Sequence, residues 1–259
     1  MRKGLWLGVG AATLGAVVLA ALPPKREALA EDKAAGCLIS GKVTWSGAIP
    51  EPRKLEVNKD NDKCECDAKD PSRKQPYKLD ESLAVDPGTQ GVANCVLWLK
   101  GASGGPAITD AQIDQRGCQF VPHVALVTTG QKVKVLNPDG ISHNFHWWST
   151  LNPPDNKTMQ KFKKTMDIPE AGFAKPEFIR VTCDIHSWMG GWIAVMENGY
   201  AARTDDKGAF TIPGVPPGKY TLACWHEPLG PEGKPFLMEQ SIVVEAGKGA
   251  SADFTLPAK

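Results

Sequence analysis

Short hydrophobic and polar runs alternate along most of the chain. The clearest strand-like runs are "CLISGKVTW" (37–45), "VANCVLWLK" (92–100), "HVALVTTGQKVKVLN" (123–137), "EFIRVTC" (177–183) and "GWIAVMEN" (191–198). Gly, Pro, Asn and Asp separate these runs, which is typical of strands joined by turns. Only "KTMQKFKKTM" (157–166) predicts a helical turn or two. We therefore expect an all-β protein.

A change in composition near residue 200 predicts a boundary between two domains. Beyond it come four strand-like runs, "AFTI", "KYTLACW", "EQSIVVEAG" and "ADFTL". Short strands at this close spacing favour a small antiparallel β-sandwich over residues 199–259. Residues 36–198 then form the first domain, which carries a polar, loop-rich insertion at residues 51–90.

Residues 1–30 predict an export segment. Arg2 and Lys3 give it a basic start, residues 4–22 carry no charge, and "ALA" at 28–30 is a small-x-small cleavage site. The apolar stretch is also almost long enough to cross a bilayer, so cleavage and retention as an N-terminal anchor both stay open. In either case we expect a periplasmic or extracellular protein, with membrane contact only if the segment is not cleaved.

The charge balance excludes one class of partner. The chain has 30 basic and 29 acidic residues, and without residues 1–30 it has 26 basic and 28 acidic ones. Proteins that bind nucleic acid carry a strong basic excess, so we expect no nucleic-acid partner. The sequence also lacks a nucleophile elbow, a phosphate-binding loop and an HExxH motif.

The chain has seven cysteines, and an odd count in an exported protein leaves at least one thiol unpaired. Cys95 and Cys224 lie in apolar runs and could be buried thiols. Cys118 is expected to close a disulfide on the insertion, at Cys64 with Cys66 as the alternative. Such a bond would hold a long polar loop in an oxidising compartment.

The stretch "VTCDIHSWMGGW" (181–192) brings together a thiol, an imidazole and a thioether. Two His and one Cys with a weak axial Met make a site that selects copper. Strand alternation places Cys183 on the same face as two apolar residues, Ile179 and Val181. The alternatives are a disulfide for Cys183, a surface position for His186 and a core position for Met189.

The second imidazole is expected from "LNPDGISHNFHWW" (136–148), which lies about 40 residues before Cys183. His143 and His146 would point to opposite faces of a strand, so only one can join the thiol. His123 and His226 are expected to be hydrogen-bonded structural residues. A cluster of His123, His146 and His226 that binds a second ion stays open as the alternative.

These motifs resemble the cupredoxins, the type 1 copper proteins. "CQFVPHVALVTTGQKVKVLNPDGISHN" is similar to the family's run before its His-Asn pair, and "CDIHSWM" has the C-x2-H-x2-M spacing of an amicyanin-like ligand loop. The resemblance implies a Greek-key β-sandwich with one type 1 copper ion. It implies His143, Cys183, His186 and Met189 as ligands, and Asn144 as a residue that steadies the ligand loop.

The C-terminal part resembles a different kind of module. "RTDDKGAFTIPGVPPGKYTLACWHE" is similar to the carboxypeptidase-regulatory-like modules of exported methylamine-utilisation-type proteins. The chain departs from simple cupredoxins in its 51–90 insertion, in His146, and in four tryptophans expected near the site, at positions 147, 148, 188 and 192.

Together these features predict an exported one-electron carrier with a transient redox protein partner. Trp188 lies between two expected ligands, and an apolar rim suits a small, short-lived interface. We do not expect an enzyme, because a substrate-binding copper needs several further His and the chain has five in all. The alternative is a non-redox copper-binding or cell-surface interaction module built on β-sandwiches.

Overall fold

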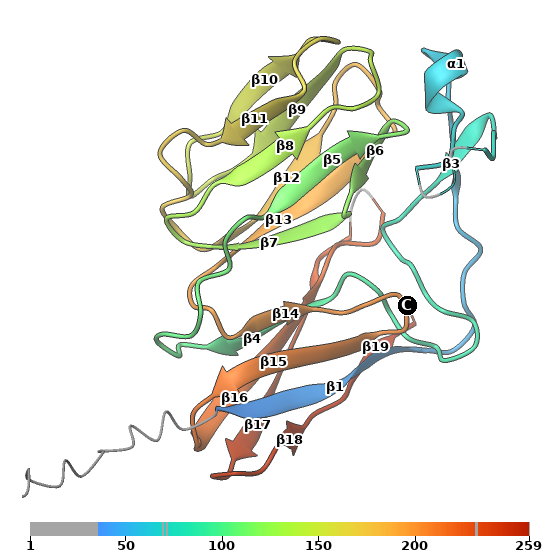
Figure 1. Cartoon of the computed structure of the whole chain (residues 1–259). Coiled ribbons are helices and arrows are strands. Elements are labelled where there is room, and N and C mark those ends of the chain that lie inside the picture. The colour runs from blue at the N-terminus through green and yellow to red at the C-terminus, as the bar shows by residue number, and fades with distance from the viewer. Residues whose placement is uncertain (1–35, 69, 71, 231–232, 259) are drawn as a thin grey trace, which may run out of the picture. The chain divides into compact units, whose positions relative to one another are not determined.

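A computed structural model describes residues 36–68, 70, 72–230 and 233–258. The predicted export segment lies outside these residues. Within them, no helix has both the length and the apolar character needed to span a membrane. The regular elements of this part are strands, apart from the four-residue helix α1 (Asn61–Cys64), so the all-β prediction is confirmed (Figure 1).

The first β-sandwich packs two sheets around one core, in the upper half of Figure 1. Val133, Phe145, Ile179 and Ile193 are fully buried between the sheets. One sheet has the order β10 (Asp155–Met159), β9 (His143–Trp148), β12 (Glu177–Thr182), β13 (Gly190–Met196) and β7 (Val124–Thr128). The other has the order β11 (Thr165–Ile168), β8 (Val133–Leu136), β5 (Gln112–Arg116) and β6 (Gln119–Val121).

The prediction of helical turns at 157–166 is wrong. Half of this segment lies in β10 and β11, and a turn closed by a hydrogen bond from Lys163 N–H to Gln160 O joins the two strands. Both strands pair with neighbours, β10 with β9 and β11 with β8. Tertiary pairing therefore overrides a composition that is compatible with a helix.

The second β-sandwich has a separate core, which includes Ile39, Leu97, Ile212 and Leu222. One sheet has the order β15 (Ala209–Val215), β1 (Cys37–Ser46) and β18 (Ala250–Ser251), and β19 (Phe254–Pro257) also pairs with β1. The other has the order β14 (Ala201–Arg203), β4 (Val96–Lys100), β16 (Gly218–His226) and β17 (Phe236–Val244).

The strand pairing differs from the predicted division at residue 198. Strands β1 and β4 precede the first sandwich in sequence, yet they lie in the sheets of the second one. Ile39 and Leu97 bury their side chains in that second core, which residues 199–259 alone would leave incomplete. The second sandwich therefore uses strands from both ends of the described chain, and the first lies between them in sequence.

The polar insertion leaves the second sandwich after β1 and reaches the first. It carries β2 (Lys54–Glu56), α1 and β3 (Tyr77–Leu79), and the rest is largely irregular. A disulfide between Cys64 and Cys118 joins it to the first sandwich, which confirms the predicted pairing. Val57 and Cys64 pack into the first core beside Phe120. The insertion is thereby fixed against the end of the sandwich that holds the expected ligands.

Candidate metal centre

Three of the predicted ligands meet at one point inside the first sandwich. His143 begins β9, and Cys183 and His186 lie in the loop between β12 and β13. The ligand atoms of the three side chains lie within 4.8 Å of one another, and all three side chains are buried. The two Nδ1 atoms are 3.0 Å apart, and Cys183 Sγ lies 3.8 Å from His186 Nδ1. Two nitrogens and one sulfur thus face a common space.

The sheet register produces this convergence. β12 pairs with β9 so that Thr182 lies opposite His146, which brings the end of β12 beside the start of β9. The predicted alternation of buried and outward-facing side chains along β12 is observed, since Ile179, Val181 and Cys183, which is the residue after the strand, are all buried.

The ligand loop then turns back on itself. Met189 N–H donates to His186 O at 2.9 Å, and Cys183 N–H donates to Met189 O at 3.3 Å. Met189 is only 2% exposed and packs in the same core as Cys183. The thioether therefore lies in a dry environment within the loop that carries two of the converging side chains.

Asn144 fastens this loop to β9. Its Oδ1 accepts backbone N–H bonds from Asp184 at 2.8 Å and Ile185 at 3.2 Å, and it lies 3.3 Å from Cys183 Sγ. Its Nδ2 donates to Asn156 Oδ1 on β10. One buried amide thus ties two strands to the loop, as the family resemblance implies for this position.

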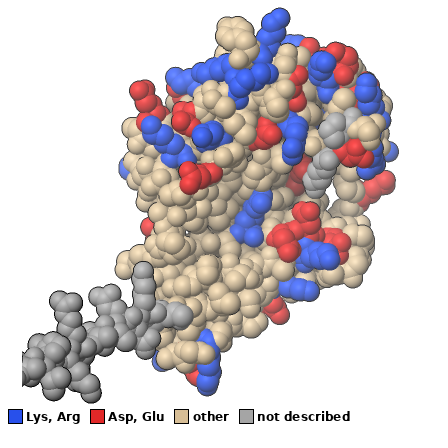
Figure 2. Space-filling model, viewed as in Figure 1, with Lys and Arg blue, Asp and Glu red and all other residues tan. Residues whose placement is uncertain are grey.

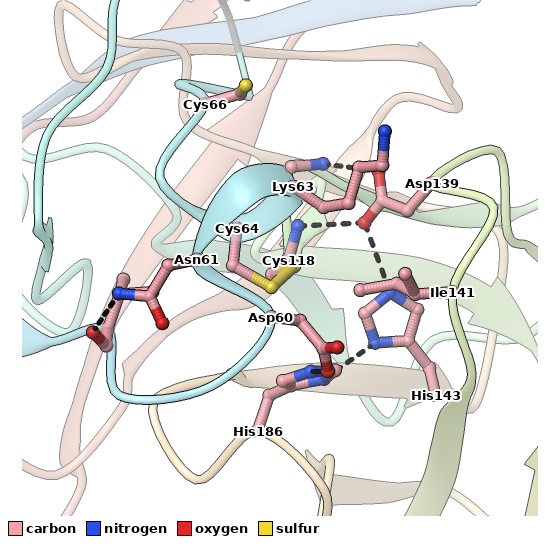
Figure 3. The surroundings of a disulfide bond; sticks show 12 residues. Asp60, Asn61, Lys63, Cys64, Cys66, Cys118, Asp139, Ile141, His143 and His186 are labelled. Carbon is pink, nitrogen blue, oxygen red and sulfur yellow. Dashed lines mark hydrogen bonds and ion pairs between the residues drawn. A yellow bond between two sulfur atoms is a disulfide. The ribbon is translucent and has the colours of Figure 1, made fainter.

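Two carboxylates hold the far nitrogens of the imidazoles. Asp139 Oδ2 lies 3.1 Å from His143 Nε2, and Asp60 Oδ2 lies 2.9 Å from His186 Nε2 (Figure 3). A carboxylate accepts a hydrogen bond from Nε2–H, so each ring keeps its Nε2 hydrogen and can offer Nδ1 to a metal. Sequence reasoning missed both residues. Asp139 precedes His143 by four positions, whereas nothing in the insertion pointed to Asp60.

The disulfide supports both carboxylates. Cys118 N–H donates to Asp139 Oδ2 at 2.9 Å, and Gly117 N–H donates to Asp139 Oδ1 at 2.7 Å. On the other side of the bond, the carbonyl of Asp60 accepts the Cys64 N–H at 2.8 Å, as Asp60 caps α1. Figure 3 shows both carboxylates and both imidazoles gathered around the Cys64–Cys118 bond. His186 is fully buried beneath this cover.

The environment favours a thiolate beside an imidazolium when no metal is bound. Burial raises the pKa of Cys183, but hydrogen bonds from His143, His186 and nearby backbone N–H groups outweigh it and lower that pKa to about 6. Burial lowers the pKa of His143, but Asp139 and Cys183 outweigh it and raise that pKa to about 8. At neutral pH the thiol is therefore already in the form that binds metals.

The remaining histidines lie apart from this centre. His146 points to the other face of β9, where its Nδ1 is 3.2 Å from Asp184 Oδ1 and its ring stacks on Trp148. His123 pairs through Nε2 with Glu227, and His226 bonds the Glu227 backbone. Within the described part of the chain, none of them belongs to a group of three converging ligands. Of the two histidines of β9, His143 is therefore the one that lies beside Cys183.

Three comparisons place the chain beside known proteins. A family model described as polysaccharide lyase family 4, domain II, matches residues 187–252. It covers much of the region for which the sequence suggests a carboxypeptidase-regulatory-like module. No curated protein matches the chain.

Solved structures similar to this chain include three copper proteins. The P52G mutant of amicyanin in its reduced Cu(I) form is 18% identical, with a TM-score of 0.30 over 35% of this chain and 86% of that one. The novel purple cupredoxin from Nitrosopumilus maritimus is 18% identical, with a TM-score of 0.28 over 34% of this chain and 100% of that one.

The third is the Cu-containing nitrite reductase (NirK) from Thermus scotoductus SA-01. It is 23% identical, with a TM-score of 0.30 over 34% of this chain. The chain spans about a fifth of that reductase, 22% of its length. Each of these similarities covers only about a third of this chain. The interpretation of the site is therefore based on the side chains of this chain alone.

Proposed function

We propose that the protein is an exported type 1 copper protein that carries single electrons. The convergence of His143 Nδ1, His186 Nδ1 and Cys183 Sγ in a buried space supports this proposal most directly. Two imidazole nitrogens and a thiolate are donors that favour a type 1 copper ion, and the buried Met189 would offer its thioether as a further, weak donor.

The residues around these donors match what such a site requires. A bound copper ion would supply one-electron chemistry by cycling between Cu(II) and Cu(I). Asp60 and Asp139 fix the imidazole rings with Nδ1 inward, and Asn144 holds the loop that carries Cys183. A donor set held this firmly limits the rearrangement that accompanies a change of charge. The buried surroundings also keep water away from the sulfur.

The proposal is for a carrier rather than an enzyme. Of the five histidines, two belong to this centre and three are engaged in separate contacts. An electron carrier needs only the one ion and a partner that docks transiently. We place it in the periplasm or outside the cell on the basis of residues 1–30, whose charge pattern and "ALA" site favour export.

Copper reconstitution of residues 31–259 tests the proposal. We expect one Cu(II) per chain, an intense visible thiolate-to-copper band, and reversible bleaching by a one-electron reductant. Cys183→Ser should abolish the band, whereas Cys95→Ala, a matched change of a thiol buried in the second core, should retain it. Stoichiometric copper without the band, or a band that cannot be reduced reversibly, would favour a non-redox copper-binding module instead.

A further inference from the structure

An electron carrier must bind its partner close to the metal. In this structure the insertion blocks access to the site from the side of His186. His186 is fully buried beneath Asp60 and the Cys64–Cys118 disulfide, and His143 and Cys183 are also buried. Among the described residues, the first sandwich nevertheless presents three large exposed apolar side chains, Trp148, Leu151 and Phe162. Their positions relative to the ends of β9 and β10 show which of them lies nearest to His143.

Phe162 lies at that end. Met159, the last residue of β10, is paired with His143, the first residue of β9. Paired Cα atoms are about 5 Å apart and each further residue adds at most about 3.5 Å, so Phe162 lies within about 15 Å of the His143 backbone. Trp148 and Leu151 lie at or beyond the other end of β9, where five residue steps correspond to about 17 Å.

The segment around Phe162 is anchored to the strand before His143. Asn137 N–H donates to Lys164 O at 2.9 Å, and Asn137 Nδ2 donates to Met159 O at 3.4 Å. The same Nδ2 donates to Ile141 O at 2.9 Å, two residues before His143. Asn137 is buried, so both ends of the turn are fixed to the backbone that leads into His143.

The turn at residues 161–164 carries three lysines, and no described acidic side chain forms an ion pair with them. We call Lys161, Phe162, Lys163 and Lys164 the basic turn. Phe162 is 73% exposed, the three lysines are exposed, and residues 156–166 contain no acidic residue. None of the three lysines forms an ion pair within the described structure. Figure 2 shows Lys and Arg atoms gathered over the end of the molecule that carries β10 and β11.

We propose that the basic turn is the docking surface for an acidic one-electron carrier protein. This inference rests on the proposed electron-transfer function and adds the surface and the charge of the partner. Lysines around an exposed aromatic ring would steer a negatively charged partner, while the ring provides an apolar contact at the centre. Such an interface is small and dissociates readily, as electron-transfer encounters do.

Trp148 is the rival docking point. Its Nε1 donates to Oγ1 of Thr182, the residue before Cys183, at 2.9 Å, and Trp148 is 53% exposed. The charges around it are mixed, with Asp184 and Arg180 both exposed, and do not select a partner of one sign. A Trp148→Ala variant therefore belongs in the test.

The first experiment needs no copper. The redox-inert anion hexacyanochromate(III) is added to the isotopically labelled metal-free protein, and paramagnetic broadening of backbone amides is recorded. We expect broadening centred on residues 160–164 that is abolished in Lys161→Glu/Lys163→Glu. A matched charge reversal on the second sandwich, Lys42→Glu/Lys219→Glu, should leave it unchanged. Broadening centred elsewhere would overturn the assignment of the surface.

The second experiment follows electron transfer by stopped flow. Ferricyanide takes one electron from the Cu(I) protein, giving ferrocyanide and the Cu(II) protein. We expect Lys161→Glu/Lys163→Glu to slow this reaction at least fivefold at low salt and to accelerate oxidation by cationic tris(phenanthroline)cobalt(III). The Lys42→Glu/Lys219→Glu control should stay within twofold of the parent.

Two results separate the possible failures. If Trp148→Ala slows the reaction with ferricyanide and the Lys161→Glu/Lys163→Glu variant does not, the docking surface is the Trp148 face and this proposal is wrong. If the parent protein gives no reducible visible band, the proposed function fails before the docking question arises. The broadening experiment on the metal-free protein still reports on the basic turn in that case.

Discussion

Asp60 Oδ2 lies 2.9 Å from His186 Nε2, although 126 residues separate the two in the chain. The carboxylate comes from the insertion and the imidazole from the ligand loop, so the insertion completes the surroundings of the proposed copper ligand. A carboxylate on the far nitrogen makes the imidazole a stronger donor, which favours Cu(II) over Cu(I).

Replacing Asp60 by Asn should therefore weaken Cu(II) binding. We expect a loss of about 10- to 100-fold in Cu(II) affinity. If Cu(I) affinity is unchanged, the reduction potential rises by roughly 60–120 mV. Chelator competition and voltammetry measure the two effects. Asp62→Asn is the matched control, because that side chain lies in the helix that Asp60 caps and is 78% exposed. Equal effects of the two changes would remove the special role of Asp60.

His143→Ala should abolish the intense visible band of the copper-loaded protein, and His146→Ala should retain it. The reason is that His143 Nδ1 faces His186 Nδ1, whereas His146 lies on the opposite face of β9 against Asp184. Absorption spectra at equal copper loading measure the difference. The opposite pattern would mean that the register of β9 is shifted by an odd number of residues.

Copper affinity should rise with pH between about 6 and 8. In the metal-free protein the pKa of His143 is raised to about 8 and that of Cys183 is lowered to about 6. Copper binds the deprotonated forms, so over this range binding displaces the His143 proton and affinity gains up to tenfold per pH unit. Below pH 6 the thiol also protonates and the slope steepens, whereas above pH 8 it flattens. A pH-independent affinity from 6 to 8 would contradict the protonated state of His143 in the metal-free protein.

Removing the disulfide with Cys64→Ala/Cys118→Ala should lower the free energy of unfolding of the metal-free protein by about 4 kcal/mol. The bond closes a loop across a sequence separation of 54, and its absence leaves the unfolded chain with more conformational freedom. Urea unfolding measures the change. Cys66→Ala removes a free, half-buried cysteine of the same segment and should cost much less. If both variants are equally stable, the bond does not constrain the unfolded chain as proposed.

Glu177 should stabilise the first sandwich in a pH-dependent way. Burial raises the pKa of Glu177, but hydrogen bonds from Ser149, Thr150 and Asn152 outweigh it and lower that pKa from 4.5 to about 2. Because the folded-state pKa is depressed, this stabilisation is fully present above about pH 4.5 and is lost as the pH falls towards 2. We expect Glu177→Gln to cost about 2 kcal/mol at pH 7, the usual contribution of hydrogen bonds to a charged group.

Urea unfolding of the metal-free protein at pH 7 and pH 3 measures this difference for Glu177→Gln. The exposed Glu170→Gln change is the control and should have little effect at either pH. A cost for Glu177→Gln that is as large at pH 3 as at pH 7 would show that shape rather than charge holds the 149–152 loop.

The closeness of Cys183 and His186 could be predicted from sequence because their spacing is short. Cys183, His186 and Met189 lie within seven residues, and strand alternation in β12 points the thiol inward. The Cys64–Cys118 bond was also predicted, since a long polar loop in an exported protein needs a covalent attachment. The first inference depends only on residues that are close in sequence, and the second depends on a single covalent bond between two segments.

The partners of the imidazoles and the pairing of the outer strands required the three-dimensional structure. Asp60 lies in a polar stretch whose composition indicates only a solvated loop, and its contact with His186 depends on where the disulfide places α1. In the same way, composition changes near residue 200, but composition does not reveal that β1 pairs with β15 and β19 at the other end of the chain. Long-range register is not encoded in a local pattern.

The second sandwich is built from strands at both ends of the described chain, so residues 101–198 form an insertion within it. We call this stretch the cassette. The ends of this stretch meet, because Leu99 N–H donates to Tyr200 O at 3.0 Å and Asn198 Nδ2 donates to Leu99 O at 2.8 Å. A short linker could thus replace the stretch and leave the second sandwich closed. A transplanted cassette would carry His143, Cys183, His186 and Met189 but not Asp60 or Cys64, which stay with the host. The proposed ligands and the Asp60–Cys64 segment that covers them therefore lie in separate parts of the sequence, and recombination could exchange one part without the other.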